Sequence, residues 1–317
     1  MIAFIFPGQG SQKVGMGKAL SDAYAICRET FAEADEALGD ALSARIFDGP
    51  EDQLTLTEHA QPAILAVSIA AYRLLTSIGV TPSYVAGHSL GEYSANVAAG
   101  TFGFADALRT VRRRGQFMQE AVPVGTGAMA AILGLDAEQV SLACLEAADG
   151  DVVSPANMNG AGQVVIAGSA AAVARAGVSA KARGAKRVIP LPVSAPFHCA
   201  LMRPAEDRLA PELRALRTDT PRVPIVANVD AEIKRDAAAA IEALVRQVSA
   251  PVRWEAVVAR LASEGVTTYV EVGPGAVLGG LVRKIHRGAT VVNFGEPGDL
   301  AAVEHLLTQA ERSQVGQ

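Results

Sequence analysis

The sequence predicts an α/β protein in which a small domain interrupts a larger one. Short apolar runs of strand character alternate with segments of helical periodicity along most of the 317 residues, which favours a parallel sheet. Near residue 126 this alternation changes, and the predicted strands and helices follow in the order β-α-β-β-α-β. In the first half of the chain, a serine flanked by two glycines lies between a strand and a helix.

The composition is that of a globular chain with a full hydrophobic core, since 50% of the residues are hydrophobic. A formal net charge of −5 leaves no global basic footprint for nucleic acid. The three cysteines lie far apart and match no metal or disulfide spacing, which favours a reducing, cytoplasmic compartment and no metal ion. No uncharged apolar stretch reaches membrane-spanning length. We expect a cytoplasmic monomer that binds neither nucleic acid nor a membrane.

The N-terminal segment predicts a buried strand over residues 2–6, followed by the glycine-rich loop Pro7-Gly-Gln-Gly-Ser-Gln12. The loop fails both phosphate-binding fingerprints, because Lys13 and Gln12 stand where glycines are required. It is either a plain turn or a backbone segment that donates an N–H group to an oxyanion. Helices are predicted over residues 19–38 and, after an irregular polar stretch, over residues 63–78.

The next stretch carries the first candidate for chemistry. A short strand over residues 84–86 leads into Gly87-His-Ser-Leu-Gly91 and then into a helix that ends near residue 99. Glycine on both sides relieves the crowding of a sharp turn and lets the hydroxyl of Ser89 stand clear at a helix N-terminus, where negative charge is favoured. The alternative is an ordinary turn whose glycines serve packing alone. The strand before the turn and the helix after it favour a nucleophilic Ser89.

The helix over residues 104–119 places an arginine on an apolar stripe. Spacings of three and four residues put Arg114 on the same face as Val111 and Met118, whereas Arg112 and Arg113 point elsewhere and are expected to be solvated. An arginine on a buried face must be paired or must hold an anionic ligand. Periodicity alone leaves both possibilities open for Arg114.

The interrupting segment predicts strands over residues 128–133, 152–158, 163–167 and 186–191, with helices over 136–148 and 169–183. This order is the ferredoxin-like pattern. We therefore assign residues 126–194 to a small domain and residues 1–125 and 195–317 to the large domain. Between two strands, the segment from Asn157 to Gly162 forms a turn whose amides can also face a cleft.

After the insertion the chain returns with Pro192-Val-Ser-Ala-Pro-Phe-His198, just before an apolar helical stretch. His88 is a poor base for Ser89, because adjacent residues in an extended segment face opposite ways. His198 is the best base candidate, although a lone histidine is more often structural. Strands are predicted over 223–229, 267–272 and 291–292, and helices over 237–248, after 275 to about 285, and over 300–310.

Several stretches together resemble the malonyl-CoA:acyl carrier protein transacylase family of bacterial fatty-acid synthesis. Each motif is weak alone, but the ordered set covers nearly the whole chain and is specific. The stretches are Phe6-Pro-Gly-Gln-Gly-Ser-Gln12 with Gly15-Met-Gly17, Gln61-Pro62, Gly87-His-Ser-Leu-Gly-Glu-Tyr93, Arg114-Gly-Gln-Phe-Met-Gln119, Gly125-Thr-Gly-Ala-Met129, Asn157-Met-Asn159 with Gly162-Gln-Val-Val-Ile-Ala-Gly168, Pro192-Val-Ser194 with His198-Cys-Ala-Leu-Met202, Val252-Arg-Trp254 and Glu271-Val-Gly-Pro-Gly275.

The resemblance implies a large hydrolase-like α/β domain with a parallel central sheet, a ferredoxin-like insertion, and an active site in the cleft between them. It implies that Ser89 attacks the malonyl thioester, that His198 is the base, and that Arg114 binds the free carboxylate. It further implies an oxyanion hole from the backbone N–H groups of Gln9 and Leu90, and a main-chain carbonyl, which we place at Gln247, that orients the histidine. It also places Met118, Asn157, Asn159 and Phe197 around the substrate.

Two departures from the family pattern concern the site. Ala250-Pro251 stands where the family often has Asn-Pro, so any contact from that asparagine is absent. Phe197 precedes the histidine where some relatives carry serine, and in related polyketide acyltransferases Phe-His goes with malonyl. The resemblance therefore favours malonyl as the acyl group.

The expected reaction is ping-pong transfer of malonyl from a coenzyme A thioester to the phosphopantetheine thiol of acyl carrier protein, with no cofactor. Alternatives are a serine thioesterase or hydrolase, a non-catalytic docking module, and an acyltransferase of polyketide or malonate decarboxylase systems. Because carrier proteins are acidic, we expect a basic patch at the cleft mouth, with Arg183, Lys186 and Arg187 as candidates.

Overall fold

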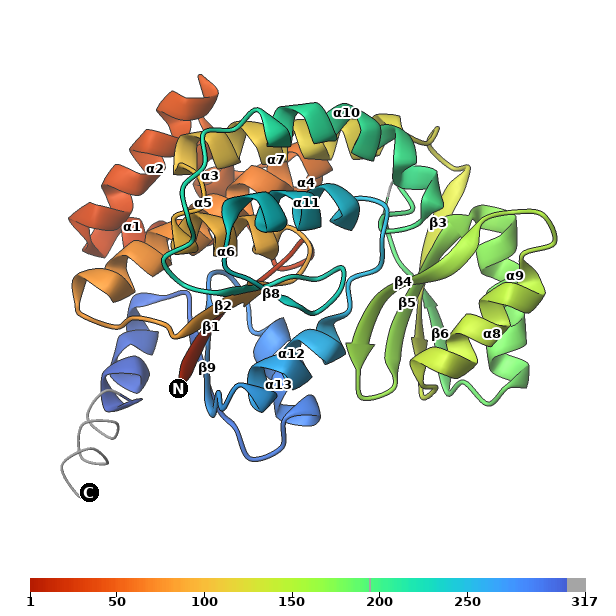
Figure 1. Cartoon of the computed structure of the whole chain (residues 1–317). Coiled ribbons are helices and arrows are strands. Elements are labelled where there is room, and N and C mark those ends of the chain that lie inside the picture. The colour runs from red at the N-terminus through yellow and green to blue at the C-terminus, as the bar shows by residue number, and fades with distance from the viewer. Residues whose placement is uncertain (194, 307–317) are drawn as a thin grey trace.

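The computed structural model describes residues 1–193 and 195–306, which form a large α/β unit and a smaller unit beside it (Figure 1). The large unit contains a six-stranded sheet in the order β10-β9-β1-β2-β7-β8. Neighbouring strands are parallel except β8, which pairs antiparallel with β7. The strands are β1 Ile2–Phe6, β2 Tyr84–Gly87, β7 Ile225–Val226, β8 Ile233–Lys234, β9 Thr268–Val272 and β10 Thr290–Phe294.

Helices cover both faces of this sheet, and the alternation of strand side chains explains how. In β1, Phe4 and Phe6 pack in one hydrophobic cluster, whereas Ala3 and Ile5 pack in another on the opposite face. The second cluster contains α12 Trp254–Ser263 and α13 Val277–Ile285. The first contains most of the remaining helices: α1 Lys18–Ala23, α2 Ala25–Leu38, α3 Leu42–Asp48, α4 Glu51–Thr55, α5 Thr57–Ser77, α6 Gly91–Ala99, α7 Phe104–Glu120, α10 Arg203–Arg214 and α11 Ala237–Gln247, with the short turns η1 Ala200–Met202 and η2 Pro297–Asp299 elsewhere in the chain.

The smaller unit is an antiparallel four-stranded sheet in the order β4-β5-β3-β6. Its elements follow the chain as β3 Gly127–Leu133, α8 Ala137–Ala147, β4 Val153–Gly160, β5 Gln163–Ser169, α9 Ala170–Ala182 and β6 Arg187–Pro190. The two helices share a hydrophobic cluster with the sheet and cover one of its faces (Figure 1). The predicted fold class, a parallel-sheet α/β unit with a ferredoxin-like insertion, is confirmed.

A backbone ladder joins the two units. Asn157 in β4 forms a parallel bridge with Val252 of the large unit. The N–H of Met158 donates to the carbonyl of Val252, and the N–H of Val252 donates to the carbonyl of Ala156, each over 2.8 Å. These bonds seat the small sheet beside the segment that precedes α12.

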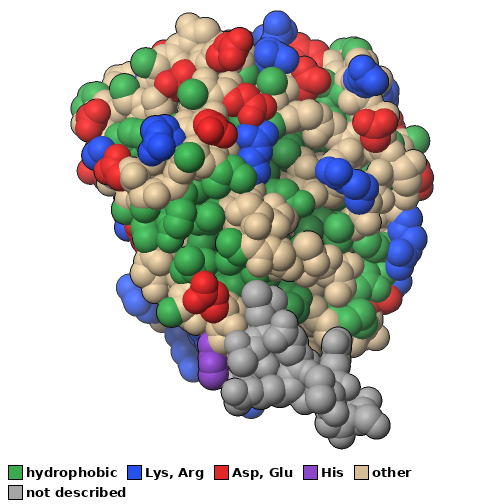
Figure 2. Space-filling view, turned by 90° about the vertical axis from the view of Figure 1, so that its left-hand side faces the viewer, with side chains coloured by type: hydrophobic (Ala, Val, Ile, Leu, Met, Phe, Trp, Pro, Cys, Tyr) green, Lys and Arg blue, Asp and Glu red, His purple; other side chains and the backbone are tan. Residues whose placement is uncertain are grey.

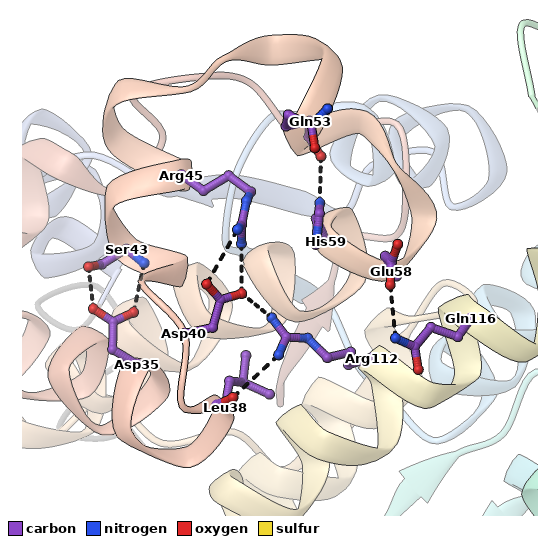
Figure 3. Close-up of polar contacts among 10 residues, drawn as sticks. All are labelled: Asp35, Leu38, Asp40, Ser43, Arg45, Gln53, Glu58, His59, Arg112 and Gln116. Carbon is purple, nitrogen blue, oxygen red and sulfur yellow. Dashed lines mark hydrogen bonds and ion pairs between the residues drawn. The ribbon is translucent and has the colours of Figure 1, made fainter.

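Helix α7 is joined to the layer formed by α2 to α5 through Arg112 and Gln116 (Figure 3). Arg112 pairs with Asp40, and Gln116 donates to Glu58 over 2.8 Å. These two contacts join α7 to the loop after α2 and to α5, outside the large sheet.

Several predicted boundaries are wrong. The helix over residues 19–38 is interrupted at Tyr24, which is extended, so that α1 and α2 are separate. Helix α5 starts at Thr57 instead of residue 63 and contains Pro62, because a proline in an early turn removes only one backbone hydrogen bond. The strand over 223–229 pairs only through Ile225–Val226, and α3, α4, β8 and α12 have no predicted counterpart. The helix over residues 300–310 is helical through 306, and its last residues lie outside the described residues.

On the face built by α1 and α2, acidic and basic side chains are interspersed, so this face presents no field of a single sign (Figure 2). Cys27, Cys144 and Cys199 are buried and unbridged. Within residues 1–193 and 195–306, no helix is both long and apolar enough to cross a bilayer. In the same residues, no group of three or more His, Cys, Asp or Glu side chains is placed to hold a metal ion.

Candidate active site

Ser89 occupies a strained turn between β2 and α6. Its φ of 51° lies in the left-handed region that disfavours side chains. A Cβ on Gly87 would lie 2.0 Å from the carbonyl oxygen of Gly91, and a Cβ on Gly91 would lie 2.0 Å from that of Phe6. Both glycines are therefore required for the turn, which supports the predicted reason for the glycine-serine-glycine pattern.

The hydroxyl of Ser89 contacts a histidine that comes from a distant part of the sequence. Ser89 Oγ lies 2.7 Å from Nε2 of His198, and Nδ1 of His198 lies 2.9 Å from the main-chain carbonyl oxygen of Gln247. Because a carbonyl can only accept, Nδ1 carries the proton and Nε2 is free to accept the proton of the serine. A carbonyl thus stands where a carboxylate completes the usual triad.

His198 is nearly fully buried, with 3% of its surface exposed. Burial, followed by the positive charge of Arg114, lowers the pKa of His198 to about 3. The imidazole is therefore neutral, as a general base must be. An anion that neutralises Arg114 would raise the pKa of His198.

Arg114 lies on the buried face of α7, as its periodicity predicts, with 2% of its surface exposed. It donates to Oε1 of Gln61 over 2.8 Å, to Oε1 of Gln247 over 2.9 Å, and to Ser89 Oγ over 3.1 Å. Tyr93 packs its ring 5.3 Å from the guanidinium carbon. Among the described residues no carboxylate forms an ion pair with Arg114, and its hydrogen-bond partners are neutral side chains, so this buried cation favours an anionic ligand.

A cavity of about 460 Å³ opens in front of Ser89, His198 and Arg114. Four other predicted site residues line it, namely Gln9, Met118, Asn157 and Phe197. The remaining lining residues are Gly10, Gln12, Thr55, Thr57, Gln61, His88, Met129, Leu191, Pro192 and Val193. The wall comes from both units, since Met129 and Asn157 belong to the small sheet.

The two groups predicted to bind an oxyanion have different surroundings. Leu90 is fully buried at the start of α6, and Gln9 lies in the loop after β1, where its side chain donates to Thr57 over 3.2 Å. Within the described part of the chain, the backbone N–H groups of Gln9 and Leu90 donate no hydrogen bond. Both are thus available to a ligand oxygen, and a buried unpaired N–H is rare in folded proteins.

Asn159 does not line the cavity but holds a residue that does. Its Oδ1 lies 2.9 Å from Nε2 of His88, whose ring also packs against Trp254 with centroids 5.8 Å apart. The His88 side chain therefore interacts with the small sheet, and no hydrogen bond joins it to Ser89 in the described structure.

Sequence reasoning missed two buried polar residues behind the serine. Asn228 accepts a hydrogen bond from the Ser89 N–H over 2.7 Å and donates to the Gly87 carbonyl over 2.6 Å. Glu92, the only charged residue in α6, accepts from the Asn228 N–H over 2.9 Å. A charged residue in an otherwise uncharged helix was a usable signal for Glu92. Asn228 lies just after the very short strand β7. The only signal for it was the rule that functional residues gather at the carboxyl ends of parallel strands.

Two residues of the predicted basic patch, Arg183 and Arg187, can be placed relative to acidic partners and to the cavity. Arg183 pairs with Glu146 and also donates to Gln139 over 3.0 Å. Arg187 lies at one end of β6, where its backbone is opposite Leu133 of β3. Leu191, just beyond the other end of β6, lines the cavity. Four residues of strand separate these two positions by about 13 Å.

The sequence is similar to a known family model and to many known relatives. Residues 3–314 match the family model of the acyl transferase domain. The chain is 53% identical over 305 residues to the malonyl CoA-acyl carrier protein transacylase of Escherichia coli (strain K12), covering 96% of this chain and 99% of the relative. It is 50% identical over 299 residues to the protein of the same name from Bacillus subtilis (strain 168), covering 93% and 94%.

Solved structures agree with these sequences. An acyl carrier protein S-malonyltransferase from Vibrio cholerae superposes with a TM-score of 0.93 at 50% identity, covering 95% of this chain and 99% of that chain. A malonyl-transacylase solved in complex with its type II PKS acyl-carrier protein superposes with a TM-score of 0.93 at 49% identity, covering 95% and 97%.

Proposed function

The chain belongs to the acyl transferase family, and on that premise we propose that it transfers malonyl from malonyl-CoA to the phosphopantetheine thiol of an acyl carrier protein for fatty-acid synthesis. The observation that carries the proposal is the buried guanidinium of Arg114, which lies 3.1 Å from Ser89 Oγ and has no carboxylate ion-pair partner in the described part of the chain. A cation at that place selects an acyl group that bears a negative charge of its own.

The first half of the reaction forms a malonyl ester on Ser89. The hydroxyl oxygen attacks the thioester carbonyl while Nε2 of His198, 2.7 Å away, takes the hydroxyl proton. We assign the N–H groups of Gln9 and Leu90 to the oxyanion that develops on the carbonyl oxygen. The carbon–sulfur bond then breaks, and the coenzyme A sulfur leaves with the proton that His198 holds.

The second half reverses these roles with a different thiol. The phosphopantetheine thiol of the carrier protein gives its proton to His198, and its sulfur attacks the malonyl ester. The ester bond to Ser89 breaks, and the serine oxygen recovers the proton from His198. The two half-reactions therefore use one base and one oxyanion site in turn, and we propose that the cycle needs no cofactor.

Arg114 contributes to selectivity in two ways. Its guanidinium can hold the malonyl carboxylate, and its charge also lowers the pKa of His198. When the carboxylate neutralises that charge, the pKa of His198 rises and the imidazole becomes a stronger base. A neutral acyl group such as acetyl gains neither effect.

The remaining proposals concern the whole molecule. The sheets support a small domain over residues 126–194 between large-domain segments 1–125 and 195–317. The buried, unbridged cysteines support a cytoplasmic setting. We propose that the molecule acts as a monomer, since both domains that line the cavity come from one chain.

The test is intact mass spectrometry after brief mixing with malonyl-CoA, for wild type and Ser89→Ala, with and without holo acyl carrier protein. We expect a malonyl adduct on wild type alone, which disappears when carrier protein is added and reappears on that protein. Loss of the adduct to water at an equal rate without acceptor would indicate a hydrolase. Failure to trap any adduct would overturn the proposal.

A further inference from the structure

We propose that Glu92 is a positioning residue: it fixes the side-chain amide of Gln247 and, through that amide, the guanidinium of Arg114. The inference rests on the proposed function, because it assigns a role in the recognition of the malonyl carboxylate. Glu92 does not line the cavity, so its effect must pass through a neighbour.

Gln247 contacts Ser89, His198 and Arg114. Its main-chain carbonyl orients His198, and its side-chain Oε1 accepts from Arg114 over 2.9 Å. Its Nε2 donates to the Ser89 carbonyl over 2.9 Å and to Oε2 of Glu92 over 2.7 Å. The main-chain carbonyl of Gln247 is fixed by its place in helix α11. Its side-chain amide can rotate unless its hydrogen-bond partners hold it.

The orientation of that amide matters because Arg114 can only donate hydrogen bonds. With Oε1 toward Arg114, the amide supports the guanidinium. In the flipped orientation, the amide nitrogen would face the guanidinium donors and displace them. Oε2 of Glu92 accepts from the amide nitrogen of Gln247 and from the Asn228 N–H, so it holds that nitrogen on its own side and leaves the amide oxygen for Arg114.

Glu92 is itself fixed in place. It lies in the first turn of α6 with 1% of its surface exposed, and its Oε2 also accepts from the Asn228 N–H over 2.9 Å. Asn228 in turn holds the backbone of Ser89. The same carboxylate oxygen therefore connects the serine turn to the amide that supports Arg114.

The experiment compares Glu92→Gln, Gln247→Met and the double variant, with malonyl-CoA and acetyl-CoA as donors and holo carrier protein as acceptor. Glu92→Gln keeps one oxygen acceptor but replaces the other oxygen by an amide donor, which can turn toward Gln247. We therefore expect KM for malonyl-CoA to rise roughly three- to tenfold while kcat and the acetyl-CoA kinetics change less than about twofold. In the Gln247→Met background, Glu92→Gln should add nothing, because its route to Arg114 is already broken.

The matched control is Glu58→Gln. Glu58 also lies in the first turn of a helix and also accepts from a glutamine, Gln116, but neither residue lines the cavity (Figure 3). We expect its kinetics to match wild type for both donors. If Glu92→Gln does not fold, Glu92→Asp, which withdraws the carboxylate by one methylene, gives the same comparison.

Additive effects of the two substitutions, or an equal loss with both donors, would overturn the inference. Failure of the proposed function is a separate result, since it would appear as the lack of any malonyl adduct on the wild-type protein. Wild-type transfer with an unchanged Glu92→Gln would reject only the role of Glu92.

Discussion

The guanidinium of Arg114 lies 3.1 Å from the hydroxyl oxygen of Ser89, so the buried cation touches the nucleophile itself. An acyl group on that oxygen starts within a few ångströms of the charge. A carboxylate separated from the ester carbonyl by one methylene can therefore reach Arg114 without leaving the serine. The short distance between Arg114 and Ser89 Oγ therefore selects acyl groups both by their negative charge and by their length.

Arg114→Ala should let neutral acyl groups compete. Loss of a charge-assisted pair costs about 1.5–3 kcal/mol, so the preference for malonyl-CoA over acetyl-CoA in kcat/KM should fall roughly ten- to a hundredfold. Arg113→Ala is the control, because Arg113 pairs with Glu212 on the exposed side of the same helix. An unchanged donor preference in Arg114→Ala would place the carboxylate site elsewhere.

The titration of His198 should respond to Arg114. Burial and the neighbouring charge lower the pKa of His198 to about 3, so its ring should remain neutral between about pH 5 and pH 8. Substituting Arg114 by alanine removes the second cause and should raise this pKa, while burial still holds it below the ordinary value. NMR titration of the histidine ring protons, assigned with His198→Asn, checks both. A wild-type midpoint near 6.5 would contradict this expectation.

Two glycine substitutions should have opposite effects. Gly91→Ala places a Cβ 2.0 Å from the Phe6 carbonyl oxygen, so the turn must distort, and we expect a loss of at least about 3 kcal/mol in the free energy of unfolding together with loss of adduct formation. Gly280 lies within helix α13, where an added methyl group would meet nothing within 4 Å beyond the helix's own backbone, so Gly280→Ala should stabilise the protein by about 0.5–1 kcal/mol. Urea unfolding measures both, and equal effects would argue against the crowded turn.

Glu92 should make the folded state less stable as pH rises. Burial raises the pKa of Glu92 from 4.5 to about 7. Between these values the folded protein keeps a proton that the unfolded chain has lost, so the contribution of Glu92 is fully present below about pH 4.5 and is lost as pH rises through about 7. The free energy of unfolding of Glu92→Gln relative to wild type should increase by about 3 kcal/mol across this window. Urea unfolding at both ends measures the difference, and a pH-independent difference would show that the carboxyl titrates normally.

Local sequence rules predicted the parts of the site that depend on neighbouring residues. The turn at Ser89 follows from glycines two residues away on each side, and the burial of Arg114 follows from helical spacing. Boundaries failed where packing overrides local preference, as at Pro62 inside α5 and at Tyr24 between α1 and α2. The roles of Gln9, Leu90 and Gln247 came from resemblance to a family, since no local pattern distinguishes a backbone N–H or carbonyl that serves chemistry.

By itself, the sequence determined that this chain alternates strands and helices, contains a glycine-flanked serine between them, and buries an arginine on one helix. These are properties of short segments, and steric and periodic rules act within such segments. Only the tertiary structure decided that His198 meets Ser89 across 109 residues and that Gln247 meets Arg114 across 133. It also decided that Glu92 and Asn228 support the serine turn from behind. Such contacts depend on the order of strands in the sheet and on how buried polar groups find partners, which only the assembled core specifies.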